Sequence, residues 1–368
     1  MLLKKIFSIF IFLTLIFCLH FSIQGQYHSS DYLEPHFIIQ LPELLRLVQI
    51  YNFGSYHCDS LSEDGYALGN GDRNCKPHSS DYNPQDWVIS FQEVLRLAQF
   101  YKSSSYHIDL SGEDGFQPGK ETEPAPGTEK TFLGIAFVWI PSGSFYMGTT
   151  KNTTELVQIY GGSPSLYSSE YPQHLVTISN GFWMSQTEIT QKQWTDIMGY
   201  NPSNNKGDNL PVENLSWNDC QNFIEKLNKL GSGTFRLPTE AEWEYACRAG
   251  STTEFCFGDD AAQLDNYGWH FYNSNYQTQP VKQKLPNAWG LYDMHGNVWE
   301  WCQDWYDDEY YQYSPTFDPT GPATGKYKVL RGGTCLRTSA RCRSAFRSWN
   351  APDLTMADQG FRICRISD

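Results

Sequence analysis

Two stretches of the sequence decide the fold: RLPTEAEWEYACRAG at Arg236–Gly250 and GLYDMHGNVWEW at Gly290–Trp301. In the first stretch Thr239 is followed three residues later by Glu242, a capping-box pattern that opens a helix. The second stretch runs around a glycine-containing turn and ends in large aromatic side chains. Together they predict a domain in which loops, short elements and aromatic packing replace long regular layers.

Several short elements are predicted before Arg236. A hydrophobic run that is broken by Pro141 and Gly143 predicts two strands that form a β-hairpin. The expected elements are this hairpin at 137–148, strands at 174–178 and from residue 182, and helices at 190–198 and 218–230.

The composition suits such a domain and argues against one class of partner. Aromatic residues make up 15% of the 368 residues, and the chain contains 29 Gly and 19 Pro. This mixture is typical of loops and short strands rather than of a helical bundle. Because the formal net charge is −14, no basic stripe is available to neutralise phosphates, and we expect no nucleic-acid partner.

The first residues predict export. Lys4 and Lys5 precede an apolar run at 6–21, and the chain turns polar at Gln24, which is the pattern of a signal peptide over residues 1–26. No second hydrophobic span follows, so we expect no transmembrane anchor after signal cleavage and a secreted, periplasmic or cell-surface location. Ten cysteines occur, of which Cys18 lies in this segment. In an oxidising compartment we expect the other nine to form mainly disulfides.

Residues 27–119 contain two copies of a unit with a period of fifty. The run His28–Tyr32 recurs as His78–Tyr82, and apolar residues at helical spacing over 43–51 recur over 93–101. Two copies at fixed spacing predict two short helical repeats, which could attach the protein to a partner module or to the cell surface. A segment poor in apolar residues, 120–129, is expected to be a linker.

An oxygen-rich loop precedes the second helix of this region. Asp81, Asn83 and Asp86 alternate before Glu93, which resembles a dockerin or EF-hand-like calcium loop. The alternative is a helix N-terminus in which the acidic residues only favour the helix dipole.

The C-terminal part resembles a known family. The two opening stretches, PVENLSWND at Pro211–Asp219, Arg331-Gly332-Gly333 and the closing Gly360-Phe361-Arg362 resemble the formylglycine-generating-enzyme, or sulfatase-modifying-factor, family in order and spacing. The resemblance covers residues 130–368. It implies an α+β, C-type-lectin-like fold with little regular secondary structure, preceded here by the two short helical repeats.

The resemblance also implies calcium sites. In the family, the positions of Asp293, Gly296, Val298 and Glu300 bind calcium, with the backbone serving at the glycine and the valine. Two carboxylates and two carbonyls in so short a span suit a hard cation, although such a turn can also use its acids to accept local amides. A second family site would use Asn266 and the carbonyl of Tyr267.

The sequence departs from the family at the catalytic cysteines. Family members that oxidise a sulfatase cysteine carry a C-x4-C pair after Arg-Gly-Gly, and its two thiolates hold copper. Here Cys335 and Cys342, the candidate catalytic pair, are separated as C-x6-C. The resemblance further implies disulfides between Cys342 and Cys247 and between Cys220 and Cys364, which leaves Cys335, Cys256 and Cys302 unassigned.

Two functions therefore remain open at this point. One is a copper-dependent formylglycine-generating oxidase that acts on a cysteine of exported polypeptides. The other is a non-catalytic, calcium-stabilised lectin-type module that binds a protein or a glycan through the loop at 336–349 and aromatic side chains.

Overall fold

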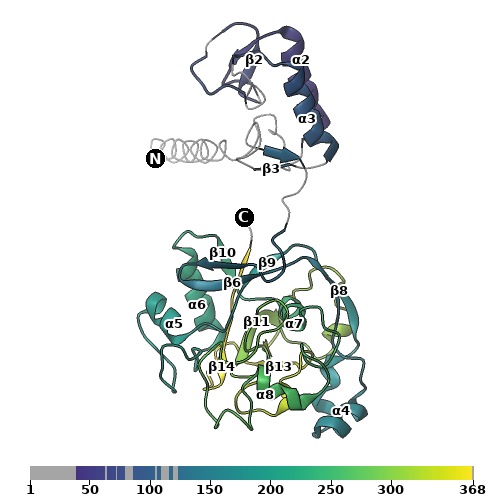
Figure 1. Ribbon diagram of the computed structural model, residues 1–368, viewed down its shortest axis with the longest axis vertical. Helices are drawn as coiled ribbons and strands as arrows, with labels where there is room; N and C mark the ends of the chain where they lie inside the picture. The colour runs from purple at the N-terminus through teal and green to yellow at the C-terminus, as the bar shows by residue number, and fades with distance from the viewer. Residues whose placement is uncertain are drawn as a thin grey trace, which may run out of the picture. The chain divides into compact units, whose positions relative to one another are not determined.

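The computed structural model describes residues 39–62, 64–71, 73–78, 86–103, 106–108, 116–118 and 123–366. The chain divides into two compact units, Met1–Thr122 and Glu123–Asp368, which are treated separately below (Figure 1). No helix of the described residues is long and apolar enough to cross a membrane. The expected signal peptide, residues 1–26, lies outside the described residues.

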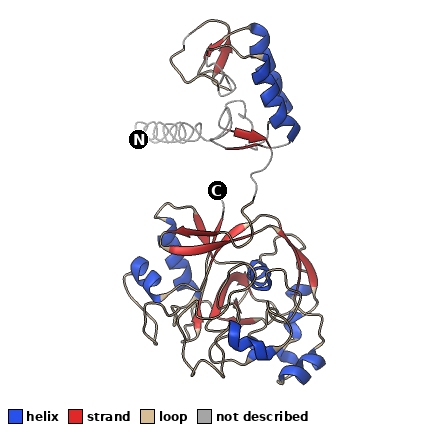
Figure 2. Cartoon of the chain, in the orientation of Figure 1, coloured by secondary structure: helices blue, strands red, loops and turns tan. Residues whose placement is uncertain are grey.

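The smaller unit contains one order of elements twice: a helix followed by an antiparallel pair of short strands (Figure 2). The elements are α2 (Leu41–Phe53), β1 (Tyr56–Cys58) and β2 (Tyr66–Leu68), then α3 (Phe91–Ser103), β3 (Tyr106–Ile108) and β4 (Phe116–Pro118). The two predicted helices are thus confirmed, whereas the strand pairs were not foreseen. Leu47 and Ile50 of α2 share a buried core with Leu97 and Phe100 of α3. A disulfide joins Cys58 to Cys75.

The acidic residues before α3 behave as helix-capping groups where the structure describes them. The Ser90 N–H donates to Glu93 Oε2 at 2.6 Å, and the Glu93 N–H donates to Ser90 Oγ at 3.3 Å. Asp86 Oδ1 accepts from the Val88 N–H at 3.1 Å. These contacts correspond to the alternative of a helix N-terminus. Asp81 and Asn83, the other expected calcium ligands, lie outside the described residues.

A five-stranded antiparallel sheet in the order β10-β15-β9-β6-β5 organises one part of the larger unit. Its strands are β5 (Glu129–Phe132), β6 (Ile135–Ile140), β9 (Phe182–Ser185), β10 (Thr234–Arg236) and β15 (Cys364–Ile366). The strand β15, the last that the structure describes, therefore lies inside the sheet, between β10 and β9, rather than at an edge.

A four-stranded sheet in the order β13-β12-β11-β14 and a separate strand pair, β7 with β8, complete the β-structure of the described larger unit. The bounds are β7 (Gly143–Met147), β8 (His174–Ile178), β11 (Trp299–Trp305), β12 (Lys328–Arg331), β13 (Ser348–Asn350) and β14 (Gln359–Gly360). The second decisive stretch of the sequence therefore ends inside β11, which pairs with β12 and β14.

The predicted hairpin at 137–148 is wrong, although both of its strands exist. The first strand, β6, pairs with β5 on one edge and with β9 on the other. It has no free edge for β7, which pairs with β8 instead. The burial pattern agrees, since five of the six β6 residues are buried while β7 alternates in exposure. Pairing was thus decided by strands distant in sequence.

Several helices of the larger unit begin at a capping box, and the sequence predicted the one at Thr239. Thr190, Ser216 and Thr239 each accept a hydrogen bond from the third helical residue in a capping box. The α-helices are α4 (Thr153–Tyr160), α5 (Gln191–Met198), α6 (Trp217–Asn228), α7 (Glu240–Arg248) and α8 (Leu264–Tyr267). Short 3₁₀ turns lie at Pro164–Leu166, Ser168–Glu170, Ala261–Gln263, Tyr310–Gln312 and Ser339–Arg341. Every residue of α7 is buried, so this helix lies inside the unit.

The larger unit begins earlier than residue 130. Glu123 accepts from the Ser142 N–H at 3.0 Å, and the Gly127 N–H donates to the Trp139 carbonyl at 3.0 Å. Residues 123–129, expected to belong to the linker, are therefore bound to the larger unit by backbone hydrogen bonds. The sequence missed this because these contacts are made by main-chain groups and by one acidic side chain.

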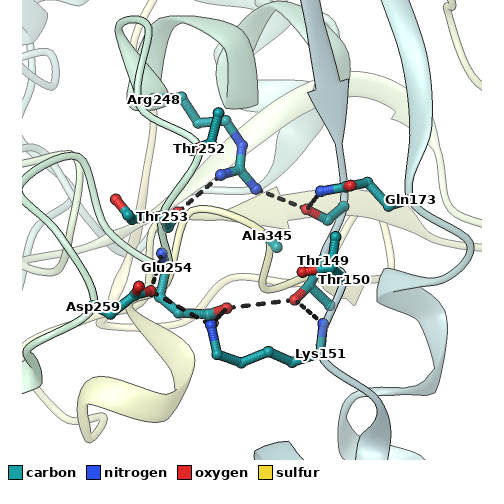
Figure 3. A pocket seen from close by; sticks show the side chains of 11 residues that line it. Thr149, Thr150, Lys151, Gln173, Arg248, Thr252, Thr253, Glu254, Asp259 and Ala345 are labelled. Atoms are coloured by element: carbon teal, nitrogen blue, oxygen red, sulfur yellow. Dashed lines mark hydrogen bonds and ion pairs between the residues drawn. The ribbon is translucent and has the colours of Figure 1, made fainter.

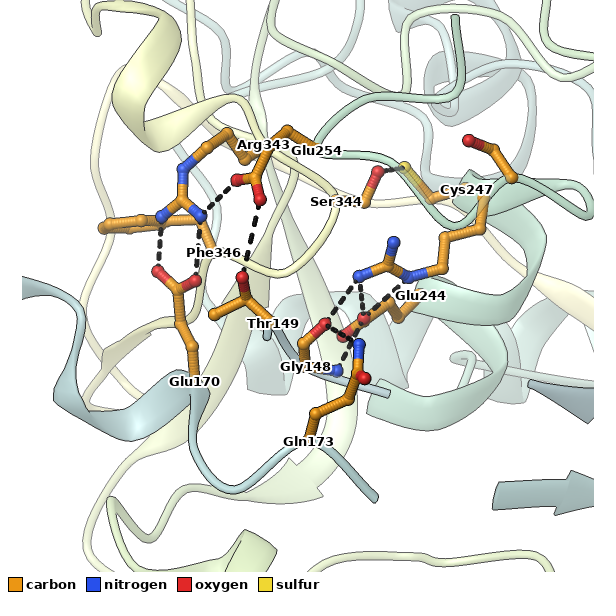
Figure 4. A network of polar contacts seen from close by, with 12 residues as sticks. Gly148, Thr149, Glu170, Gln173, Glu244, Cys247, Glu254, Arg343, Ser344 and Phe346 are labelled. Carbon is orange, nitrogen blue, oxygen red and sulfur yellow. Dashed lines mark hydrogen bonds and ion pairs between the residues drawn. The ribbon is translucent and has the colours of Figure 1, made fainter. Parts of the chain in front are cut away.

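Buried ion pairs connect the loops of the larger unit to α7 and to each other (Figure 4). The Arg343 guanidinium contacts the carboxylates of Glu170 and Glu254, each at 2.9 Å from Nη1, and all three residues are buried. Glu244 of α7 accepts from Arg248 at 2.7 Å and from the buried Arg331. Because an unpaired charge in the interior is very costly, removing one member of such a pair should unfold its surroundings.

Arg343→Met removes the guanidinium from Glu170 and Glu254. We expect the free energy of unfolding of the larger unit to fall by about 3–5 kcal/mol, because the buried Glu170 loses its cationic partner and Glu254 keeps only Lys151. Urea unfolding followed by tryptophan fluorescence measures this. The control is Lys229→Ala, whose ammonium pairs with Glu225 on the surface and should leave the midpoint unchanged. An Arg343→Met protein with the wild-type midpoint would contradict the expectation.

Candidate functional site

The two candidate catalytic cysteines lie in the interior. Cys335 is 2% exposed and Cys342 is fully buried. Burial is the main cause that raises the pKa of each thiol to about 12, and the negative charge of Asp358 contributes to the rise at Cys335. The two residues lie close enough for the charge of Cys335 to raise the pKa of Cys342. Both thiols are therefore protonated at neutral pH.

The backbone N–H and carbonyl groups of Cys335 also have hydrogen-bond partners. The Cys335 N–H donates to the Asn297 carbonyl at 2.9 Å, and Ser274 Oγ donates to the Cys335 carbonyl at 2.7 Å. Gly333 has a φ of +78°, and a Cβ there would lie 2.6 Å from Cys342 Sγ. Because both thiols are buried and are separated as C-x6-C, this pair differs from the C-x4-C pair that holds copper in the family.

The predicted disulfides of the larger unit are wrong in this structure. All seven of its cysteines are reduced. Cys247 Sγ faces Ser344 Oγ at 3.6 Å instead of Cys342, which packs against Phe255 and Leu264 (Figure 4). The reduced residues are Cys220, Cys247, Cys256, Cys302, Cys335, Cys342 and Cys364. The predicted partner of Cys247 was wrong by two positions: Ser344 faces its thiol where Cys342 was expected.

His295 has a structural role among these thiols. Its Nδ1 lies 2.8 Å from the Cys342 carbonyl, and its Nε2 accepts from the Cys256 N–H at 3.2 Å. These contacts assign the proton to Nδ1 and leave neither nitrogen free.

The first expected calcium cluster is only partly assembled. Glu300 accepts from Arg362 at 2.6 and 2.8 Å and from Trp243 Nε1 at 2.7 Å, so both of its oxygens have partners. Asp293 Oδ2 accepts from the Lys282 N–H at 2.8 Å, while its buried Oδ1 has no partner. Among the described residues, no group of three or more His, Cys, Asp or Glu is placed to hold a metal ion.

Gly296 and Val298, the expected carbonyl ligands, lie on the turn between these two acids. Gly296 has a φ of +144°, and a Cβ there would lie 2.1 Å from the Trp269 carbonyl oxygen. The turn therefore requires glycine, as expected for a backbone that must approach another closely. Burial raises the pKa of Asp293 to about 6, and the charge of Glu300 contributes to the rise.

The residues of the second expected calcium site lie on α8. The Asn266 side chain donates to Gln263 Oε1 at 3.2 Å, and its carbonyl accepts from the Leu285 N–H at 2.9 Å. Tyr267 stacks its ring on Phe257 at 4.4 Å. These contacts bring no carboxylate to the two residues.

Glu188 is a candidate residue that the sequence analysis missed. It is fully buried, and neither of its carboxylate oxygens has a hydrogen-bond partner. Burial, and then the charges of Asp293 and Glu300, raise its pKa well above the ordinary value. The sequence held one indication of a buried acid here, since Glu188 lies between Thr187 and Ile189, shortly after a hydrophobic strand.

Two loops that are hydrogen-bonded to each other next to Cys335 form an exposed aromatic surface, defined here as Phe271, Tyr272, Tyr276 and Leu336. Tyr272 is 75% exposed and Tyr276 is 60% exposed, and both rings contact that of Phe271 at about 5 Å. The Phe271 N–H donates to the Arg337 carbonyl at 2.9 Å, which joins the two loops. Exposed aromatic groups on a fixed backbone are typical of binding surfaces.

A polar pocket of about 190 Å³ lies elsewhere in the larger unit (Figure 3). Lys151 reaches across it to Glu254 at 3.0 Å and to Asp259 at 3.4 Å. The pocket is lined by Gly148, Thr149, Thr150, Lys151, Gln173, Arg248, Thr252, Thr253, Glu254, Asp259 and Ala345. Neither candidate catalytic cysteine is among these residues.

Comparison with known proteins identifies the family. Residues 122–366 match the sulfatase-modifying factor enzyme 1-like domain. The chain belongs to this family. Its domain is similar to the formylglycine-generating enzyme of Streptomyces coelicolor, with 39% identity over 175 residues, which is 44% of this chain and 54% of that enzyme. The chain thus spans about half the length of this relative. A chaperone protein named LppX, from Paenibacillus barcinonensis, is 32% identical over 285 residues and is covered for 97% of its length by 64% of this chain.

Solved structures agree with this assignment. Treponema denticola variable protein 1 has a TM-score of 0.56 and 28% identity, over 65% of this chain and 98% of that one. PvdO from Pseudomonas aeruginosa has a TM-score of 0.58 and 28% identity, over 66% of this chain and 100% of that one. The sulfatase-modifying-factor domain therefore has the α+β, C-type-lectin-like fold with little regular secondary structure that the sequence resemblance implied.

The burial of the thiols predicts a selective alkylation pattern. Among the seven reduced cysteines, which the structure describes in full, Cys256 alone is partly exposed. A pKa of about 12 leaves roughly one part in ten thousand of Cys335 or Cys342 as thiolate at pH 8. We expect iodoacetamide at pH 8 to modify Cys256 first and the other two only after unfolding in urea. Peptide mass mapping checks this, and early modification of Cys335 would contradict it.

Proposed function

We propose that this sulfatase-modifying-factor domain is a non-oxidising module that binds exported polypeptides through its aromatic surface. The observation that carries the proposal is the contrast at one place in the fold. Cys335 and Cys342 are buried and protonated, whereas Tyr272, Tyr276 and Leu336, on the adjoining loops, are exposed. The buried thiols disfavour oxidation of a bound cysteine, whereas the exposed side chains favour binding of another molecule.

The polypeptide class is supported by the relatives and by the chemistry of the surface. The chain covers nearly the whole of LppX, whose name describes a chaperone protein, but only about half of the Streptomyces coelicolor formylglycine-generating enzyme. Tyrosine and leucine side chains on a fixed backbone supply large apolar contact area at a small entropy cost. Polypeptide segments that expose apolar residues are the partners that such a surface fits.

Export remains part of the proposal. The predicted signal peptide at 1–26 and the disulfide between Cys58 and Cys75 support an oxidising location, either secreted, periplasmic or at the cell surface. The smaller unit would then attach the binding module to a partner or to the surface. Calcium would act as a structural support of the fold rather than as a participant in a reaction.

The absence of oxidase activity is tested directly. The purified protein is incubated with Cu(I), oxygen and a peptide that carries a sulfatase-motif cysteine. We expect the peptide mass to remain unchanged, because the two cysteines are buried away from a substrate and lack the C-x4-C spacing of the family's copper pair. The formylglycine-generating enzyme of Streptomyces coelicolor is the positive control. A hydrazine-reactive aldehyde formed by this protein would refute the non-oxidising proposal.

Binding is tested with a permanently unfolded polypeptide, reduced and carboxymethylated lactalbumin, by fluorescence anisotropy. Replacing both Tyr272 and Tyr276 by serine should weaken binding at least tenfold, since such aromatic groups carry roughly 1–2 kcal/mol each at interfaces. Tyr146→Ser, at a tyrosine that is 58% exposed on β7, is the matched control and should bind normally. Equal affinity in all three proteins would reject the surface. Binding to a glycan array without binding to the polypeptide would favour the glycan alternative.

A further inference from the structure

Two arginines between the candidate catalytic cysteines differ from the other arginines of this part of the chain. Arg331, Arg343 and Arg347 are buried, and each forms an ion pair with a buried glutamate. Arg337 and Arg341 are partly exposed, and neither takes part in the ion pairs of the described residues. The Nε of Arg337 is buried without a hydrogen-bond partner. Such a donor in a native fold requires an explanation.

The two guanidinium groups lie within range of each other's positive charge. Burial lowers the pKa of Arg341, and the charge of Arg337 lowers it further. The Arg341 guanidinium lies over the Phe346 ring, 5.7 Å from the ring centroid, and this contact positions the group without neutralising it. Burial raises the pKa of Asp358, and the charge of Arg337 opposes the rise, but the hydrogen bond that Asp358 accepts comes from Thr334, at 3.3 Å. Two cations thus face one acid, and they repel each other unless an anion joins them.

The backbone holds both arginines in fixed positions. The Arg337 N–H donates to the Thr334 carbonyl at 3.0 Å, and the Arg337 carbonyl accepts from the Phe271 N–H at 2.9 Å. The Arg341 N–H donates to the Thr338 carbonyl at 3.0 Å. Because this part of the loop is already ordered, binding of an anion has to order little more than two side chains.

The arginines adjoin the aromatic surface. Arg337 directly follows Leu336, which is 38% exposed. The hydrogen bond from the Phe271 N–H joins Arg337 to the loop that carries Tyr272 and Tyr276. An apolar side chain bound by this surface therefore places the neighbouring residues of its own segment beside the guanidinium groups.

We infer, on the basis of the proposed function, that Arg337 and Arg341 bind a carboxylate of the polypeptide held by the aromatic surface. The site then selects segments in which a carboxylate lies next to apolar residues. A carboxylate fits because its two oxygens accept parallel hydrogen bonds from guanidinium groups. Its single negative charge also suits a place beside the buried Asp358, which would repel a dianion more strongly. Because the whole chain has a formal net charge of −14, a preference for acidic peptides must come from this place rather than from general attraction.

The test compares the binding of three dye-labelled peptides to the full-length protein by fluorescence anisotropy. All three contain the same segment of leucine and phenylalanine. The first has a glutamate beside this segment and an amidated C-terminus, the second has glutamine and an amidated C-terminus, and the third has glutamine and a free C-terminal carboxylate. We expect the glutamate peptide to bind roughly tenfold more tightly than the second peptide, as is typical of hydrogen bonds between charged groups. Tighter binding of the third peptide alone would assign the site to the carboxylate of a chain end.

Arg337→Gln and Arg341→Gln separate the carboxylate site from the aromatic surface. Each variant should bind the glutamate peptide and the amidated glutamine peptide with nearly equal affinity, and should keep the wild-type affinity for the latter. Lys229→Gln removes an exposed positive charge at the end of α6 and should keep the preference for glutamate. Without peptide, each arginine variant should unfold at the wild-type temperature or above, because one of two like charges is removed.

The possible failures are distinguishable. Equal binding of all three peptides by the wild type would overturn the carboxylate site and leave the aromatic surface in place, whereas no binding of any peptide would reject both. A preference for glutamate that survives in both arginine variants would overturn the assignment to these residues. An arginine variant that unfolds well below the wild-type temperature would show that its guanidinium has a structural role instead.

Discussion

Buried contacts between arginines and carboxylates connect the loops of the larger unit to its short helices and strands. Glutamates of α7 and of neighbouring loops receive the guanidinium groups, and nearly all of the partners are inaccessible to solvent. The pairs join Arg248 and Arg331 to Glu244, Arg343 to Glu170 and Glu254, Arg347 to Glu240, and Arg362 to Glu300. Apart from Arg248–Glu244, which lies within α7, each pair holds two segments in one relative position, because any other position would leave a charge unpaired in the interior.

This constraint explains why residues 342–347, in the segment after Gly333, are buried. Arg343 points inward to Glu170 and Glu254, and its neighbours Cys342 and Ser344 are buried with it. The C-x6-C spacing therefore reflects a segment that serves packing. The same inward direction brings Ser344 to Cys247, so a hydroxyl contacts the thiol where the family resemblance implied a disulfide.

Local signals in the sequence predicted local structure well. Thr190, Ser216 and Thr239 start helices because a cap depends only on residues within one turn. The partner of β7 could not be predicted in this way, since it depended on both edges of β6 being occupied by distant strands. The motif at 290–301 singled out Asp293 and Glu300, whose binding of calcium stays a prediction. It could not show that Arg362, distant in the sequence, forms an ion pair with Glu300, or that Glu188 lies close to Asp293.

The two loops of the aromatic surface are attached through main-chain atoms. The links run from the Phe271 N–H to the Arg337 carbonyl, from the Cys335 N–H to the Asn297 carbonyl and from Ser274 Oγ to the Cys335 carbonyl. The exposed side chains of Tyr272, Tyr276 and Leu336 take no part in them. Their identities can therefore be exchanged without loss of the scaffold, and this face of the domain is a natural place to randomise residues when selecting new specificities.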